Sequence, residues 1–136
     1  MILNFQNFLI REFNENKTIV YRGAPSPEFG KGNWKGVFVS TDLKSAQQYH
    51  ENIYKYELSD CKLLDENDPN AEKLADYWLD NSKDPDVKYV NEIDDLWMFP
   101  PDGWINHLRK LGYDGMSFGM DRFIFNTDKL KFIISI

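Results

Sequence analysis

The chain has 136 residues, a net charge of −6 and an aromatic content of 15%. Its length fits a single domain over residues 1–136, and its aromatic residues supply a core that an intrinsically disordered chain would lack. The acidic balance disfavours a nucleic-acid partner, because such proteins usually present a basic face to phosphate. The single cysteine, Cys61, excludes an internal disulfide.

No apolar run in the sequence approaches membrane-spanning length. The first ten residues lack a basic region, and Asn4, Gln6 and Asn7 interrupt their apolar positions, so we do not expect a signal peptide. These features predict a cytoplasmic protein with no membrane partner.

The N-terminal part of the chain predicts a helix followed by strands. Apolar residues recur at helical spacing over residues 2–14, which is typical of an amphipathic helix. β-branched and aromatic residues then predict strands over residues 18–22, 36–40 and 52–58, with residues 62–64 as a continuation of the sheet.

Two connections between these strands stand out. Residues 25–36 contain two prolines and three glycines, with Phe29 and Trp34 between them, and we expect a loop of the kind that often carries function. After the second strand, Thr41 or Asp42 would cap a short helix over residues 43–50, because either side chain can accept from free N-terminal amides.

The rest of the chain predicts helices and then strands. Asp68 and Pro69 have the character of an N-cap and first helical residue, Asp102 would cap a later helix, and Gly112 would end it in the left-handed conformation. Helices are expected over residues 69–80, 90–97 and 103–111, with a polar turn at residues 81–86 and a stop at Pro100–Pro101. Strands are expected over residues 113–118, 121–126 and 131–136.

Strands therefore gather at both ends of the chain, with helices between them. This order favours the α+β class over a repeated βαβ fold. The short loops within residues 113–136 predict that these last strands are antiparallel neighbours.

Familiar catalytic sets are not supported. His50 and His107 are far apart in sequence and lack ligand-spaced neighbours, so no metal site is expected. Cys61 is interpreted as a structural or surface residue. No phosphate-binding glycine motif is present, and the acidic runs are typical of solvated faces.

A set of weak motifs remains, at the ends of strands and before helices. Taken singly, an arginine at a strand end is usually an ion-pairing residue, and a Ser-Thr pair before a helix is usually a cap. In chain order the motifs are Tyr21-Arg22-Gly23, Val37 to Asp42 followed by Ala46 and Tyr49, Leu111 to Gly115, and Asp121 to Asn126.

Taken together and in order, these motifs resemble the ADP-ribosyltransferases, and most closely the small ADP-ribosyltransferase domains of phage and mobile-element polyvalent proteins. The similarity spans residues 18 to about 136 and leaves residues 1–16, with the N-terminal helix, outside it. The resemblance implies a split antiparallel sheet core with flanking helices. It also implies that NAD is bound as a substrate and that no metal is needed.

The resemblance further implies roles for individual residues. Arg22 would donate to a phosphate or ribose hydroxyl of NAD, and the backbone of Gly23 would approach the nicotinamide amide. Ser40 would orient the nicotinamide ribose or brace Arg22, and Tyr49 would stack on the nicotinamide ring. Tyr21 and Thr41 complete the set of NAD-binding residues.

The catalytic set is then Arg22, Ser40 and Asp121, of which Asp121 departs from the family. The family usually has Glu at this station, to hold the ribose hydroxyl and stabilise the positive charge that develops as nicotinamide leaves. Asp is one methylene shorter, so its carboxylate would fall short by on the order of an ångström. Arg22 and the Ser40-Thr41 pair match the Arg-Ser-Glu class, in which a Ser-Thr-Ser strand forms the second station.

The expected function is therefore NAD-dependent mono-ADP-ribosylation of a protein target, by a phage or mobile-element effector that acts in the host cytoplasm. One alternative is a catalytically degenerate member of the fold that binds a protein partner, through residues such as Trp97, Phe99 and Trp104. Another is transfer of a phosphate from RNA to NAD, against which the net charge of −6 argues.

Overall fold

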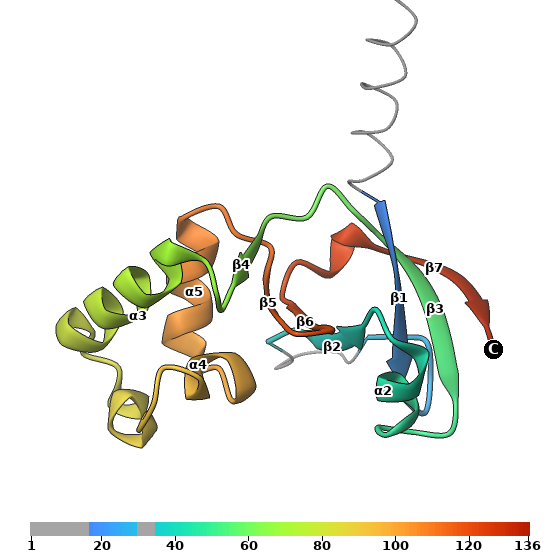
Figure 1. Ribbon diagram of the computed structural model, residues 1–136, viewed down its shortest axis with the longest axis horizontal. Coiled ribbons are helices and arrows are strands. Elements are labelled where there is room, and N and C mark those ends of the chain that lie inside the picture. The colour runs from blue at the N-terminus through green and yellow to red at the C-terminus, as the bar shows by residue number, and fades with distance from the viewer. Residues whose placement is uncertain (1–16, 30–34) are drawn as a thin grey trace, which may run out of the picture.

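The structure, a computed structural model, describes residues 17–29 and 35–136. The helix expected over residues 2–14 and the predicted loop residue Trp34 lie outside the described residues. The described chain is a mixed α+β protein (Figure 1), which confirms the predicted class. Its strands are β1 (Lys17–Gly23), β2 (Val37–Ser40), β3 (Ile53–Ser59), β4 (Leu63–Asp65), β5 (Gly115–Phe118), β6 (Asp121–Ile124) and β7 (Leu130–Ser135). Its helices are α2 (Leu43–Gln47), α3 (Pro69–Asn81), α4 (Asp95–Met98) and α5 (Asp102–Lys110), with 3₁₀ turns η1 (Pro85–Tyr89) and η2 (Thr127–Lys129).

The seven strands lie in the order β4-β5-β6-β2-β1-β3-β7. All neighbouring pairs are antiparallel except β4 and β5. β1 pairs with β3 along its whole length, whereas its recorded pairing with β2 is the Tyr21–Ser40 pair. The sheet therefore consists of two halves, β4-β5-β6-β2 and β1-β3-β7, that meet at this pair.

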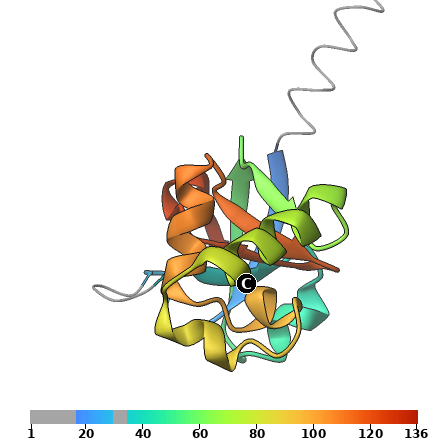
Figure 2. The same cartoon turned by 90° about the vertical axis from the view of Figure 1, so that its left-hand side faces the viewer.

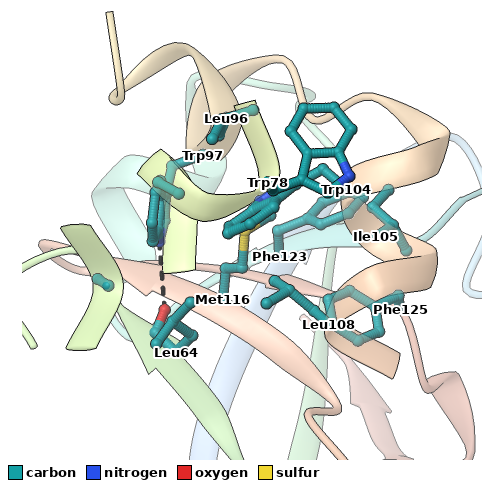
Figure 3. Close-up of a cluster of buried hydrophobic side chains, with 12 residues drawn as sticks. Leu64, Trp78, Leu96, Trp97, Trp104, Ile105, Leu108, Met116, Phe123 and Phe125 are labelled. Atoms are coloured by element: carbon teal, nitrogen blue, oxygen red, sulfur yellow. Dashed lines mark hydrogen bonds between the residues drawn. The ribbon is translucent and has the colours of Figure 1, made fainter. Parts of the chain in front are cut away.

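Two apolar cores lie on opposite faces of β2 and β6. The helical core lies between the β4-β5-β6-β2 half and helices α3, α4 and α5 (Figures 1 and 2). It contains Trp78, Trp97 and Trp104, and the indole of Trp97 donates to the Leu64 carbonyl at 3.2 Å (Figure 3). The strand core lies between the two halves of the sheet and contains Val20, Val37, Val39, Tyr54, Tyr56, Leu58, Ile124 and Leu130.

Several local predictions are confirmed. Asp68 caps α3 by accepting from the Asn70 amide, and Pro69 is the first helical residue. Asp42, rather than Thr41, caps α2, by accepting from the Ser45 amide at 3.1 Å. Gly112 follows α5 with φ +90°, the left-handed conformation expected at that position.

The predicted cap of α5 is wrong. Pro101 occupies the N-cap position, and Asp102 is the first residue of the helix. The Asp102 carboxylate pairs instead with the Lys35 ammonium at 2.8 Å.

The predicted helix over residues 90–97 is also wrong. The chain is irregular over residues 90–94, after η1, and the short helix α4 begins only at Asp95. The carboxylate of Asp95 accepts from the backbone amides of Asn91 and Glu92 at 2.9 and 3.2 Å. Such side-chain bonds give the backbone an alternative to helical hydrogen bonding.

The prediction for the last three strands is confirmed only in part. β5 and β6 form an antiparallel hairpin, but β7 pairs with β3 at the opposite edge of the sheet. β4 belongs to the sheet as expected, although it lies beside β5 and far from β3, which precedes it in the chain.

Within residues 17–29 and 35–136, no helix is both long enough and apolar enough to cross a bilayer.

Candidate functional site

A cavity of about 630 Å³ lies where β1 and β2 diverge. We call it the β1–β2 cleft. Arg22 and Gly23 at the end of β1 line one side, and Phe38 of β2 with Phe123 of β6 lines another. Its remaining walls come from Lys35, Gly36, Val37, Tyr49, Met98, Phe99 and Pro100. The cleft is therefore largely apolar, with one guanidinium and one phenol among its polar groups.

The side chain of Arg22 is held by the loop that follows β1. Its Nη1 donates to the carbonyls of Ser26 and Glu28, both at 3.3 Å, and its guanidinium carbon lies 5.3 Å from the centre of the Phe29 ring. These contacts orient the side chain without using a carboxylate. Among the described residues, both hydrogen bonds to carbonyls use Nη1, and the guanidinium also interacts with the Tyr56 hydroxyl. A guanidinium carries five N–H donors, so donors remain for an anionic ligand within this described part of the chain.

Gly23 lies directly against α2 and the turn that follows it. A Cβ at this position would collide with the Ala46 carbonyl oxygen and lie 2.9 Å from the His50 amide nitrogen. Any side chain would therefore push α2 away from the end of β1. The absence of a side chain brings Tyr49, which follows α2, to the edge of the cleft.

Tyr49 is 59% exposed at that edge. Partial burial raises the pKa of its hydroxyl, and the nearby Asp121 carboxylate adds to the effect. The phenol is therefore neutral at ordinary pH and has Asp121 in its surroundings.

Strand register aligns three of the predicted residues. Ser40 is paired with Tyr21 of β1 on one side and with Asp121 of β6 on the other. Paired residues in antiparallel strands point to the same face, so Tyr21, Ser40 and Asp121 form a row across β1, β2 and β6. Arg22 is the next residue along β1, and by strand alternation it starts on the opposite face.

Ser40 and Thr41 are engaged in holding the turn that precedes Asp121. The Met120 carbonyl accepts from the Ser40 hydroxyl at 3.3 Å, the Thr41 hydroxyl at 3.3 Å and the Thr41 amide at 2.9 Å. The Ser40 oxygen also accepts from the Asp42 amide at 3.0 Å, and the residue is 1% exposed. These bonds fix the start of β6 relative to the start of α2.

The structure thus brings together two groups of predicted residues. Arg22, Gly23 and Tyr49 line the cleft, whereas Ser40, Thr41 and Asp121 do not form part of its wall. The Asp121 carboxylate is near enough to Tyr49 to contribute to the raised pKa of its hydroxyl. A contact with Arg22 was one of the two roles expected for Ser40; it is not among the described hydrogen bonds, in which Ser40 binds the Met120 carbonyl.

Sequence reasoning missed the apolar walls of the cleft. Phe38 and Phe123 face each other across the β2–β6 pair, with ring centres 4.7 Å apart. Both occur inside predicted strands, where an aromatic residue is expected on packing grounds alone. Phe99 follows α4, and nothing in its local sequence indicates that it lies near β1.

Other chemistry is limited among the described residues. They include no group of three or more His, Cys, Asp or Glu side chains placed to hold a metal ion. Burial, with a contribution from Asp114, raises the pKa of the Cys61 thiol to about 12. This residue is therefore protonated at neutral pH and is a poor nucleophile.

The sequence matches no protein-family model and no curated protein. One solved structure that is similar to this chain is described as the crystal structure of an anti-CRISPR protein. The two share 14% sequence identity and a TM-score of 0.49, over 88% of this chain and 96% of the other. This degree of similarity identifies neither a family nor a function.

Proposed function

We propose that this protein is an NAD-dependent mono-ADP-ribosyltransferase that modifies a protein target. The observation that carries the proposal is the convergence of separate motifs on one cavity. Arg22 and Gly23 of the first motif and Tyr49 of the second line the β1–β2 cleft, and the carboxylate of Asp121, from the last motif, is near enough to Tyr49 to affect its pKa. The cleft volume of about 630 Å³ lies within the range of small-molecule sites.

The side chains suit the parts of NAD. Arg22 offers a fixed guanidinium to the diphosphate. Tyr49 and the Phe38–Phe123 pair offer aromatic surfaces to the nicotinamide ring. The Asp121 carboxylate would stabilise the positive charge on the ribose as the bond to nicotinamide breaks and its electron pair leaves with the ring nitrogen.

In this proposal Ser40 and Thr41 act on Asp121 rather than on the ribose. Their hydroxyls hold the Met120 carbonyl, and Met120 directly precedes Asp121. They are therefore positioning residues. The acceptor on the target protein would attack the ribose carbon and lose a proton, which completes the transfer.

A specific observation favours a second candidate, a degenerate member of the fold that acts by binding a partner. Neither Ser40 nor Asp121 forms part of the cleft wall, and Asp121 is shorter than the glutamate that the family uses. Met98 and Phe99 are also well exposed beside the cleft. In both candidates we propose a host protein as the partner, in keeping with the resemblance to phage and mobile-element domains.

The decisive experiment measures nicotinamide release from NAD by the purified protein, alone and with host extract. We expect Arg22→Ala and Asp121→Ala each to reduce release at least about 100-fold, because each removes a charged group from the reacting complex. Lys131→Ala removes an exposed cation on β7 and should leave release unchanged. Asp121→Glu restores the missing methylene and should keep or raise the rate.

The opposite result is equally clear. Absence of NAD binding and of nicotinamide release, with recovery of one stoichiometric partner from host extract, would replace the transferase by the binding protein. Full activity of Arg22→Ala would remove Arg22 from the site.

A further inference from the structure

A second cavity of about 440 Å³ adjoins the β1–β2 cleft. The two cavities share Lys35, Phe99 and Pro100 in their walls. The second cavity is also lined by Asp86, Tyr89 and Asp95, and we call it the acidic groove. A segment lying in this groove would reach the cleft by passing Phe99.

Large apolar side chains stand exposed along this path. Tyr89, Met98 and Phe99 are 68%, 53% and 77% exposed. Single exposed apolar residues are ordinary, but a cluster around a groove marks a surface that binds a partner. Exposed aromatic residues are the usual anchors of such interfaces.

The charge of the surrounding chain is strongly one-sided. Residues 84–102 carry six carboxylates and one ammonium, that of Lys88. Lys35, the cation in the groove wall, is paired with Asp102 at 2.8 Å. Of these carboxylates Asp86 and Asp95 line the groove, and because its Lys35 ammonium is paired with Asp102, the groove has a net negative charge beside exposed aromatic rings.

These features select the chemistry of the occupant. A negative groove repels nucleic acid and a second copy of this chain, whose net charge is −6. It attracts lysine and arginine side chains, and an exposed aromatic ring adds a cation–π contact. The ammonium of Lys88 already lies 5.0 Å from the centre of the Tyr89 ring, so this ring accepts a cation.

We propose that the acidic groove binds a basic, arginine- or lysine-rich segment of the target protein and directs its acceptor side chain past Phe99 into the cleft. The delivery of an acceptor side chain to the cleft rests on the proposed transferase function. Binding of the basic segment in the groove does not require catalysis. Charge complementarity would fix which surface of the target is presented to the bound NAD.

The test measures binding of two fluorescein-labelled peptides to the full chain by fluorescence anisotropy. It is run at about 50 and about 150 mM salt, because screening of exposed charges differs between these concentrations. One peptide is an Arg-Gly repeat and the other a Glu-Gly repeat. We expect the Arg-Gly peptide alone to bind, more weakly at the higher salt. Asp86→Lys in the groove should weaken it about five- to tenfold.

The matched control is Asp128→Lys, which makes the same change of net charge at an exposed position in η2. Equal weakening by the two variants, or equal binding of the two peptides, would overturn the proposal. Nicotinamide release by the wild type without peptide separates the two claims. Peptide binding that depends on Asp86, without NAD cleavage, would support the docking surface and overturn the transferase proposal. NAD cleavage with peptide binding that does not depend on Asp86 would support the transferase and overturn the docking surface.

Discussion

The Ser40 hydroxyl acts on the backbone of neighbouring residues. It accepts from the Asp42 amide and donates to the Met120 carbonyl in a buried position. We expect Ser40→Ala to lower the free energy of unfolding by about 1–2 kcal/mol, because it leaves the part-buried Asp42 amide without an acceptor. Urea unfolding checks this value. Thr41→Val, which removes a more exposed bond to the same carbonyl, should have the smaller effect, and a reversed order would contradict this role for Ser40.

His107 makes stability depend on pH. Its ring stacks between Tyr77 and Trp104, and its Nε2 is buried with no hydrogen-bond partner among the described residues. Burial, assisted by Lys110, lowers its pKa from the ordinary value of 6.5. The folded protein then binds fewer protons than the unfolded chain, so the free energy of unfolding falls as the pH decreases from 6.5 through the lowered pKa.

The comparison with His107→Phe isolates this effect, because Phe keeps the aromatic stack and does not titrate. We expect the wild type to lose stability relative to His107→Phe as the pH falls from about 7.5 to about 5.5. This range extends about one unit to either side of the ordinary histidine pKa. Denaturant midpoints at several pH values measure the difference. Parallel curves for the two proteins would show that the neutral form of His107 is not favoured by the fold.

At the scale of elements, the chain between α3 and α5 shows what a sequence pattern does and does not predict. In the segment expected to be a helix over residues 90–97, Val90, Ile93 and Leu96 all contact the helical core. The segment is nevertheless not one helix, because the Asp95 carboxylate binds backbone amides that a helix would use differently. The spacing of apolar residues indicates which side chains are buried, whereas local side-chain hydrogen bonds determine the backbone conformation.

The same distinction applies to the site. Arg22, Gly23 and Tyr49, which line the cleft, were selected by the order of their motifs along the chain and by the resemblance, because each motif is weak when taken singly. The walls that Phe38, Phe99 and Phe123 supply depend on contacts between distant parts of the chain, which no local pattern specifies.

Asp114 joins three strands and links the two later motifs, Leu111 to Gly115 and Asp121 to Asn126. Its carboxylate accepts from the Lys62 amide at 2.9 Å and from the Asn126 side chain at 3.0 Å. Its own amide donates to the Lys62 carbonyl, and its carbonyl accepts from the Phe125 and Asn126 amides. Asp114 therefore joins the start of β4, the start of β5 and the end of β6.

We expect Asp114→Ala to lower the free energy of unfolding by about 3 kcal/mol, because two charge-assisted bonds are lost. Asn126→Ala should lose about 1 kcal/mol, and the double variant should lose less than the sum of the two, since the residues share a bond. Thermal or urea unfolding of the three variants completes the cycle. Exact additivity would mean that the Asp114–Asn126 bond contributes nothing to stability.

At the scale of the whole molecule, the position of β7 in the sheet could not be predicted from the sequence. Short loops suggested that β7 would follow β6 in the sheet, but it pairs with β3 instead. Leu130 then enters the strand core beside Val20 and Tyr56. This pairing buries apolar side chains from both halves of the sheet, and a local sequence pattern does not show such contacts between distant segments.

The two cores should unfold as one unit, because β2 and β6 contribute to both. Phe38 and Phe123 pack against the helical core, whereas Val39 and Ile124 lie in the strand core. Loss of either core would expose one face of the strands that support the other. In a two-state domain, probes of different regions report a single transition.

Tryptophan fluorescence and far-UV circular dichroism test this coupling in a Trp34→Phe background, in which the remaining tryptophans, Trp78, Trp97 and Trp104, all lie in the helical core. Val39→Ala removes buried methyl groups from the strand core alone and should lower the free energy of unfolding by about 2 kcal/mol. Because the cores share β2 and β6, both signals should shift to the same lower denaturant midpoint. If the fluorescence midpoint stayed in place while the dichroism changed, the helical core would be stable without the strand core, and the shared strands would not couple them.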